Sequence, residues 1–194
     1  FESNEEMNAF RYTDFGYQQF IEAAKKEKYF DNTIFIFVGD HGITGDAGNI
    51  YPRSWTNQRL TAEHVPLLIY APKLVQPQII NNVCSQIDIF PTIATFLKIP
   101  YRNNAMGRNI LDTAAVKDKC AFVMDHDLKT IGVVTDQYLF QQQLQSGKAA
   151  FVSVVNDEPV KQSATTDSIK NYLGELTRAY YETAKYLILN NKKH

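Results

Sequence analysis

The chain has 194 residues, of which 44% are hydrophobic, 12% aromatic and 21% charged. This composition is typical of a globular protein and excludes the disordered, collagen-like and low-complexity classes. Lys and Arg number 20 and Asp and Glu number 21, so the formal net charge of −1 provides no general attraction to nucleic acid or anionic lipid.

The chain offers no sign of a membrane span or of a disulfide framework. Its longest apolar stretch, Val65 to Ala71, contains a proline and is far shorter than the roughly 20 residues that cross a bilayer. The amino end, FESNEEMNAF, lacks the basic and apolar regions of an export signal, so we expect any signal or anchor to lie outside this sequence. Cys84 and Cys120 are isolated, and we expect two unpaired core thiols.

The first half of the chain predicts a helix, two buried strands and a long loop. Apolar and aromatic residues recur at helical spacing from Met7 to Lys28. Thr33 to Val38 is a continuous β-branched and aromatic run, which favours a strand in the middle of a covered, parallel sheet. The polar stretch from Gly39 to Glu63 is long for a connection and is typical of a functional loop. Val65 to Tyr70 predicts the second buried strand.

The second half predicts a helix, an antiparallel hairpin and a final long helix. Ser85 to Leu97 has helical spacing, and Cys120 to Met124 predicts a strand. Thr130 to Thr135 and Gln137 to Gln143 predict a hairpin that turns near Asp136, and Ser168 to Leu189 predicts the last helix. With no internal repeat or linker, we predict an α/β fold: a layered, mostly parallel sheet flanked by helices, with antiparallel edge strands toward the C-terminus.

The sharpest chemical signal is the tetrapeptide Gly39-Asp40-His41-Gly42, directly after the first predicted strand. Ligands of open α/β sheets bind beyond the carboxyl ends of strands, which is where this tetrapeptide lies. A carboxylate oxygen and an imidazole nitrogen suit Zn, Mn or a similar divalent ion, and the glycines allow a sharp turn. The alternative is a plain turn in which Asp40 binds nearby amides and His41 packs.

Four segments in order give the chain a family resemblance: NTIFIFVGDHG, EHVPLLIYAP, SQIDIFPTIATFLKIP and GRNIL. Together they resemble the carboxyl-terminal half of the catalytic domain in the sulfatase branch of the alkaline phosphatase superfamily. The stretch from Arg11 to Asp14, RYTD, is similar to one in the lipoteichoic acid synthase and phosphoglycerol transferase group, which the chain resembles most. The resemblance extends from about Phe10 to Leu111, roughly half of the chain.

The resemblance implies roles for several residues. Asp40 and His41 match the family's divalent-metal ligands, and the histidine favours Mn or Zn over Ca. His64 falls where relatives often place a histidine that contacts the phosphoryl group or the leaving oxygen; alternatively it is a polar cap on the following strand. Asp88 is expected to be a helix-start carboxylate and Gly107-Arg108 a structural turn.

Three side chains of the loop between Ile43 and Ala62 are candidates for substrate binding. Arg53 and Arg59 carry guanidinium groups that suit phosphate or sulfate, and Trp55 is able to stack on a sugar or glycerol unit. Each is alternatively an ordinary solvated loop residue. Met124 to Asp127, MDHD, also has metal-friendly side chains, but we interpret it as a hairpin turn.

The family's nucleophile and its acidic metal ligand belong to an amino-terminal half that does not match any part of this sequence. We therefore expect residues 1–194 to be the carboxyl-terminal portion of one sulfatase-like catalytic domain, inactive alone and partnered by the missing half. The complete enzyme is expected to transfer phosphoglycerol or phosphoethanolamine to cell-envelope lipid or glycan. The alternatives are a sulfatase or phosphodiesterase on the same scaffold, and a non-catalytic metal- or glycan-binding α/β module.

The resemblance also implies a location and a substrate class. Transferases of this group carry membrane helices ahead of an extracytoplasmic catalytic domain, so we expect a membrane-anchored parent with this part in the periplasm or at the cell surface. The expected partner is a phospholipid head group or envelope glycan. Nucleic acid is not expected, because the 23 Tyr and Phe residues do not alternate with a basic stripe.

Overall fold

The structure is a computed structural model that describes residues 4–112 and 119–190. The chain divides into two compact units, one of Phe1–Val38 with Pro66–Gln78 and the other of Gly39–Val65 with Ile79–His194. Among the helices in these described ranges, none combines the length and the apolar character needed to span a membrane.

The first unit contains one long helix and a two-stranded sheet. Helix α1 spans Glu5–Ala24 and starts at Asn4, whose side chain accepts a hydrogen bond from the Met7 amide. It is followed by the short 3-10 helix η1, Phe30–Asn32, and by strand β1, Phe35–Val38. The helix predicted from Met7 to Lys28 is therefore confirmed, although its last four residues form turns instead.

Aromatic side chains hold α1 against β1 within this unit. Tyr17 meets Phe37 with the ring centroids 4.9 Å apart, and Phe20 meets Phe35 at 5.9 Å, both edge to face. Ala24 is the helix residue that becomes buried, among the described residues of α1. The aromatic spacing that indicated a helix thus also provides the contact face of that helix.

The direction of the β1 pairing corrects one prediction. Strand β1 pairs antiparallel with β2, Leu67–Tyr70, with Phe35 opposite Tyr70 and Val38 opposite Leu67. Phe35 is the buried residue of β1, with 7% exposed, whereas Val38 is 39% exposed. Within the described residues the predicted parallel sheet, with this strand covered on both faces, is therefore not found. A run of β-branched and aromatic residues indicates a strand, but it carries no information about the direction of the partner strand.

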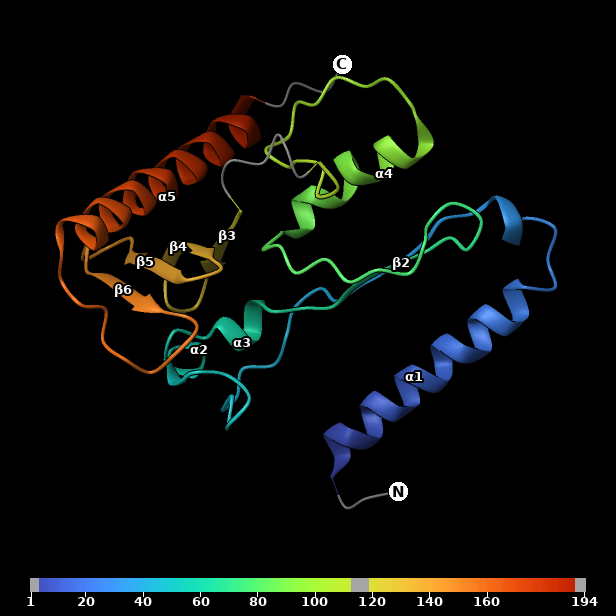
Figure 1. Cartoon of the computed structure of the whole chain (residues 1–194), viewed down its shortest axis with the longest axis horizontal. Helices are drawn as coiled ribbons and strands as arrows, with labels where there is room; N and C mark the ends of the chain where they lie inside the picture. Colours follow the sequence, from blue (N-terminus) through green and yellow to red (C-terminus); the bar gives the residue numbers. More distant parts are fainter. Residues whose placement is uncertain (1–3, 113–118, 191–194) are drawn as a thin grey trace. The chain divides into compact units, whose positions relative to one another are not determined.

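The second unit is built on a four-stranded antiparallel sheet in chain order. Its strands are β3 (Cys120–Asp125), β4 (Thr130–Thr135), β5 (Tyr138–Gln143) and β6 (Ala149–Ser153). The predicted hairpin is confirmed, as is the turn after Asp125. Helix α5, Ala164–Asn190, lies along one face of this sheet (Figure 1) and confirms the final predicted helix. The chain is therefore an α/β protein, with antiparallel strands toward its C-terminus.

Side chains cover both faces of this sheet. On one face, Leu173 of α5 packs with Cys120, Val133 and Phe140, and these four residues are buried. On the other face Leu60 packs with strand residues of the sheet and with Val154 just beyond β6. Leu60 opens the short helix α3, Leu60–Glu63, which follows α2, Arg53–Asn57. Packing on this second face brings α3 close to the end of β3.

The remaining helix of the second unit begins at a buried carboxylate. The 3-10 helix η2, Gln86–Asp88, leads into α4, Ile89–Leu97, in agreement with the predicted helix. Asp88 is 4% exposed, and its carboxylate accepts hydrogen bonds from the Ser85 amide at 2.9 Å and the Arg108 amide at 2.8 Å. Its predicted helix-start role and the structural role of Gly107-Arg108 are confirmed. Cys84 and Cys120 are not joined by a disulfide.

Candidate functional site

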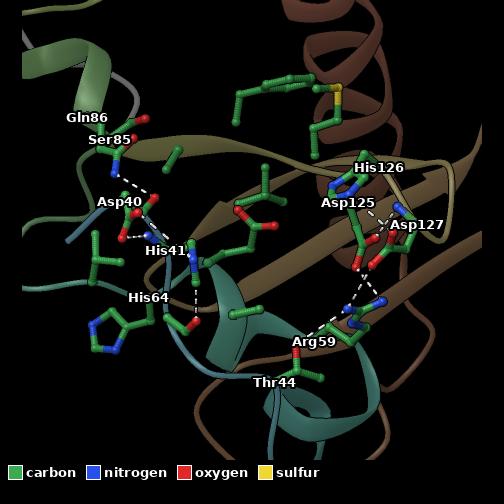
Figure 2. Close-up of a pocket in the computed structure, with 18 of the residues that line it drawn as sticks. Asp40, His41, Thr44, Arg59, His64, Ser85, Gln86, Asp125, His126 and Asp127 are labelled. Carbon is green, nitrogen blue, oxygen red and sulfur yellow. Dashed lines mark hydrogen bonds and ion pairs between the residues drawn. The ribbon is translucent and has the colours of Figure 1, made fainter. Parts of the chain in front are cut away.

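A cavity of about 520 Å³ lies within the second unit. Its wall is formed by the loop after β1, helix α3, the start of η2 and the end of β3 with its following turn. Figure 2 shows Asp40 and His41 on one side of this pocket and Asp125, His126 and Asp127 on the other. The pocket therefore brings together segments that are far apart in the sequence.

The hydrogen bonds of His41 determine which ring nitrogen is available to a ligand. His41 Nδ1 lies 2.8 Å from the carbonyl oxygen of Gly42. Because a carbonyl oxygen only accepts, the neutral ring carries its proton on Nδ1 and keeps the lone pair on Nε2. Metal-binding histidines in proteins are commonly oriented by such a contact from the other nitrogen. His41 therefore presents Nε2 as a free electron-pair donor.

Asp40 presents a second donor beside this nitrogen. Its Oδ1 accepts the His41 amide at 3.0 Å, and its Oδ2 lies 4.0 Å from His41 Nε2. The backbone amide of His41 lowers the pKa of Asp40, so the carboxylate is ionised near neutral pH. The Gly42 carbonyl and then the Asp40 charge raise the pKa of His41. Both side chains are exposed, so a ligand has free access to the pair.

The loop that carries the pair is fixed at both ends. Gln86 Nε2 donates to the carbonyl oxygens of Gly39 at 2.6 Å and Asp40 at 3.1 Å. On the other side the Gly42 amide donates to Ala62 O of α3 at 2.7 Å. This role of Gln86 was not predicted, because a glutamine near a helix start carries no recognisable sequence signal of such a contact.

Asp40 and His41 fit a divalent metal as two of its ligands. A carboxylate and an imidazole together suit Zn or Mn, and Asp40 Oδ2 lies 4.0 Å from His41 Nε2. Across residues 4–112 and 119–190, however, no group of three or more His, Cys, Asp or Glu side chains is arranged to hold a metal. The remaining ligands of such a site would have to come from other residues.

His64 lines the same pocket but has an aromatic environment. It ends α3, where its amide donates to Leu60 O at 3.0 Å. Its ring lies edge-on to Trp55, with centroids 5.2 Å apart, and to Tyr51, at 5.8 Å. In Figure 2 the ring points away from His41. His64 is thus the C-cap of α3 and lines the pocket, whereas the following strand begins only at Leu67.

Trp55 and Arg53 do not line the pocket. The Trp55 indole nitrogen donates to Val154 O at 2.9 Å, and its ring stacks on Tyr51 with centroids 4.1 Å apart. Trp55 therefore packs α2 against the sheet. Arg53 is exposed, and its backbone amide donates to the Asp157 carboxylate at 2.6 Å. The structure brings neither side chain to Asp40 and His41.

Arg59 does line the pocket, where carboxylates surround it. One terminal nitrogen lies 3.2 Å from Asp125 Oδ2, and the other lies 3.4 Å from Asp127 Oδ2. The same second nitrogen donates to Thr44 Oγ1 at 3.4 Å. Figure 2 shows Arg59 between these groups.

The turn after β3 is a part of the pocket that sequence analysis did not identify. We interpreted Met124 to Asp127 as a hairpin turn; the β3–β4 pairing confirms the hairpin, although Met124 and Asp125 are the last residues of β3. The same turn supplies Asp125, His126 and Asp127 to the pocket wall, with His126 Nε2 3.1 Å from Asp127 Oδ1. Desolvation and then the charge of Asp125 raise the pKa of Glu63 on the facing helix. This wall is therefore acidic.

Comparisons with known proteins identify the family. The sulfatase family model matches residues 3–99, which is half of the chain. Arylsulfatase K of Canis lupus familiaris is 28% identical over 120 residues, covering 61% of this chain and 21% of that protein. Arylsulfatase K of Gallus gallus is 30% identical over 100 residues, covering 51% and 18%. The lipoteichoic acid synthase-like YvgJ of Bacillus subtilis (strain 168) is 23% identical over 146 residues, covering 71% and 23%.

The chain thus spans about a fifth of the length of the curated relatives that it matches. The matched residues include the loop with Asp40 and His41, helix α3 with His64, and the buried Asp88. The family model covers the first two of the four sequence segments and nearly all of the third, whereas GRNIL at residues 107–111 lies beyond it. The chain belongs to the sulfatase family.

Proposed function

We propose that this chain supplies Asp40 and His41 to the divalent-metal site of an enzyme that acts on phosphodiesters. The observation that carries the proposal is the Nδ1 contact of His41 with Gly42 O, which leaves Nε2 free beside an ionised carboxylate. Members of the sulfatase family generally use a divalent metal, and the imidazole favours Mn or Zn over Ca.

The chemistry divides between this chain and the rest of the enzyme. When bound, the metal lowers the pKa of a coordinated hydroxyl and stabilises negative charge on the phosphoryl oxygens. Asp40 and His41 bind the ion, while Gln86 and the Ala62 carbonyl hold their loop in place. The nucleophile and the remaining ligands are proposed to come from an amino-terminal half of the domain, so residues 1–194 alone should be inactive.

We propose transfer of phosphoglycerol or phosphoethanolamine to cell-envelope lipid or glycan as the reaction. The similarity to a lipoteichoic acid synthase-like protein supports this choice. The similarity to arylsulfatase K supports the alternative, a sulfatase or phosphodiesterase on the same scaffold, equally well. For an envelope transferase, the parent protein would be membrane-anchored with this part outside the cytoplasm.

We also propose roles in substrate binding for His64, Arg53 and Trp55. His64 lines the pocket and is the candidate for contact with the phosphoryl group or the leaving oxygen. Arg53 is exposed, and the indole nitrogen of Trp55 already has a partner, so either would contact a substrate only at the outer end of a long head group.

The test is activity of the complete parent enzyme with a phosphoglycerol lipid and with a sulfate ester. Asp40→Ala should lower kcat/KM on the true substrate on the order of 10³-fold or more, since charge stabilisation is lost. Asp136→Ala, in the exposed β4–β5 turn, is the matched control and should have no effect. Unchanged activity in Asp40→Ala would instead support a non-catalytic metal- or glycan-binding module.

A further inference from the structure

Arg59 is a cation of the pocket wall, but its charge is already paired with carboxylates. Its two terminal nitrogens face two carboxylates, Asp125 at 3.2 Å and Asp127 at 3.4 Å. One positive and two negative charges sum to −1 for this cluster. A phosphate or sulfate group that approached Arg59 would meet net repulsion unless it displaced one of these carboxylates. The guanidinium is therefore already occupied.

The carboxylate of Asp125 is buried and hydrogen-bonded to the backbone of the turn that follows it. The side chain of Asp125 is 9% exposed, and its Oδ1 accepts the amides of Asp127 and Leu128, both at 2.9 Å. Its other oxygen, Oδ2, faces Arg59. The buried Asp125 side chain thus binds both the backbone of the turn and the Arg59 guanidinium. Loss of either contact would leave the Asp125 charge only partly compensated.

Arg59 joins three segments of the pocket wall. Its backbone has a left-handed conformation with φ of 56° immediately before α3. From this position its side chain reaches the turn after β3 and also Thr44, three residues beyond His41. Its Nε atom is buried and has no hydrogen-bond partner among the described residues. The side chain is therefore largely buried, with 26% of it exposed.

We propose that Arg59 is a positioning residue, which fixes the Asp125–Asp127 turn as one wall of the pocket opposite Asp40 and His41. It does not act as an anion-binding subsite. The inference deepens the proposed function, on which it rests for the identity of the pocket. Arg59 was a candidate for phosphate or sulfate binding from the sequence, whereas in the structure its guanidinium is paired with Asp125 and Asp127.

The first test uses NMR on the 194-residue chain. The Nε–Hε signal of Arg59, assigned from its absence in Arg59→Lys, should not move when inorganic phosphate is added to millimolar concentration. A saturable shift of this signal would overturn the proposal. Arg59→Ala should shift the His126 ring signals, whereas Arg178→Ala, at an exposed site on α5, should not. Unshifted His126 signals in Arg59→Ala would also overturn it.

The conservative variant Arg59→Lys tests whether a positive charge at this position holds the turn. Lysine at this position has a single ammonium group and pairs with one carboxylate at a time. Arg59→Lys should therefore restore the His126 signals in part. Signals that match those of Arg59→Ala would show that the positive charge does not hold the turn.

The second test uses the parent enzyme and its active substrate. Arg59→Ala and Asp125→Asn should raise KM by similar factors, because both remove the Arg59–Asp125 ion pair. For the same reason the double variant should have a KM no higher than that of either single variant. If Arg59 bound the substrate anion, Asp125→Asn would free it and lower KM. A parent enzyme inactive on both esters would refute the proposed function, while the NMR result would still decide the role of Arg59.

Discussion

Substitution of Gly42 tests whether the loop of Asp40 and His41 is held as the structure shows. A Cβ atom at this position would lie 2.1 Å from Thr61 O and 2.8 Å from His64 O, both backbone atoms of α3 and its end. Distances below 3.0 Å essentially never occur for real Cβ contacts. Gly42→Ala must therefore move the loop away from α3 and stretch the 2.7 Å bond between the Gly42 amide and Ala62 O.

The expected destabilisation follows from these two losses. Overpacking costs about 1–3 kcal/mol, and one lost hydrogen bond adds about 1 kcal/mol. Gly42→Ala should thus lower the free energy of unfolding of the second unit by about 2–4 kcal/mol. Trp55, the single tryptophan, lies in this unit, so urea unfolding followed by its fluorescence reports the change.

Gly45→Ala provides the matched control in the same loop. No atom lies within 4 Å of a Cβ at Gly45, and its φ is not in the left-handed region. Alanine there should leave stability unchanged or raise it by roughly 0.4–1 kcal/mol through the unfolded state. Equal unfolding midpoints for Gly42→Ala and Gly45→Ala would refute the close approach of the loop to α3.

Three further predictions concern buried and half-buried groups of the second unit. Asp88→Asn should destabilise it by about 1–3 kcal/mol in urea unfolding, because an amide cannot accept both backbone hydrogen bonds; wild-type stability would contradict this. Burial raises the pKa of Tyr180 to about 12. Its contribution to stability should be complete below pH of about 10 and disappear as pH rises toward 12, a dependence that Tyr180→Phe should remove. Burial also raises the pKa of the Cys84 thiol, so iodoacetamide should alkylate it more slowly in the folded chain than in urea.

Periodicity was sufficient to predict most of the second unit. The alternation in residues 130–143 defines a hairpin because each strand has one face on α5, and adjacent antiparallel strands need only a short turn. The helix start at Asp88 was also predictable. Its carboxylate accepts the amide hydrogen bond of Ser85, only three residues earlier in the chain. Both features depend on contacts between neighbours in the sequence.

The pairing of β1 could not be predicted in the same way. The run from Phe35 to Val38 is apolar on both faces, a pattern that is typical of a covered parallel strand. In the structure it pairs antiparallel with Leu67–Tyr70, and its far end is partly exposed. Hydrophobicity indicates how much surface a strand can bury, but strand direction depends on the path of the connecting chain.

Residue type was an incomplete guide to the loop after His41. Trp55 and Arg59 were candidates for ligands because indole and guanidinium groups commonly bind sugars and phosphates. The structure uses the Trp55 indole in a bond to Val154, 99 residues away, and pairs Arg59 with Asp127, 68 residues away. Partners at such separations are set by the tertiary fold, so a single sequence cannot reveal them.

The two walls of the pocket illustrate this difference in one site. The donor orientation of His41 depends on Gly42, its immediate neighbour, and the tetrapeptide was enough to suggest a metal ligand. The opposite wall exists only because the β3–β4 pairing places Asp125 opposite Thr130 and the packing of α3 on the sheet brings Arg59 to this turn. A single sequence can therefore suggest the pair Asp40 and His41, whereas the wall that faces the pair depends on strand pairing and helix packing.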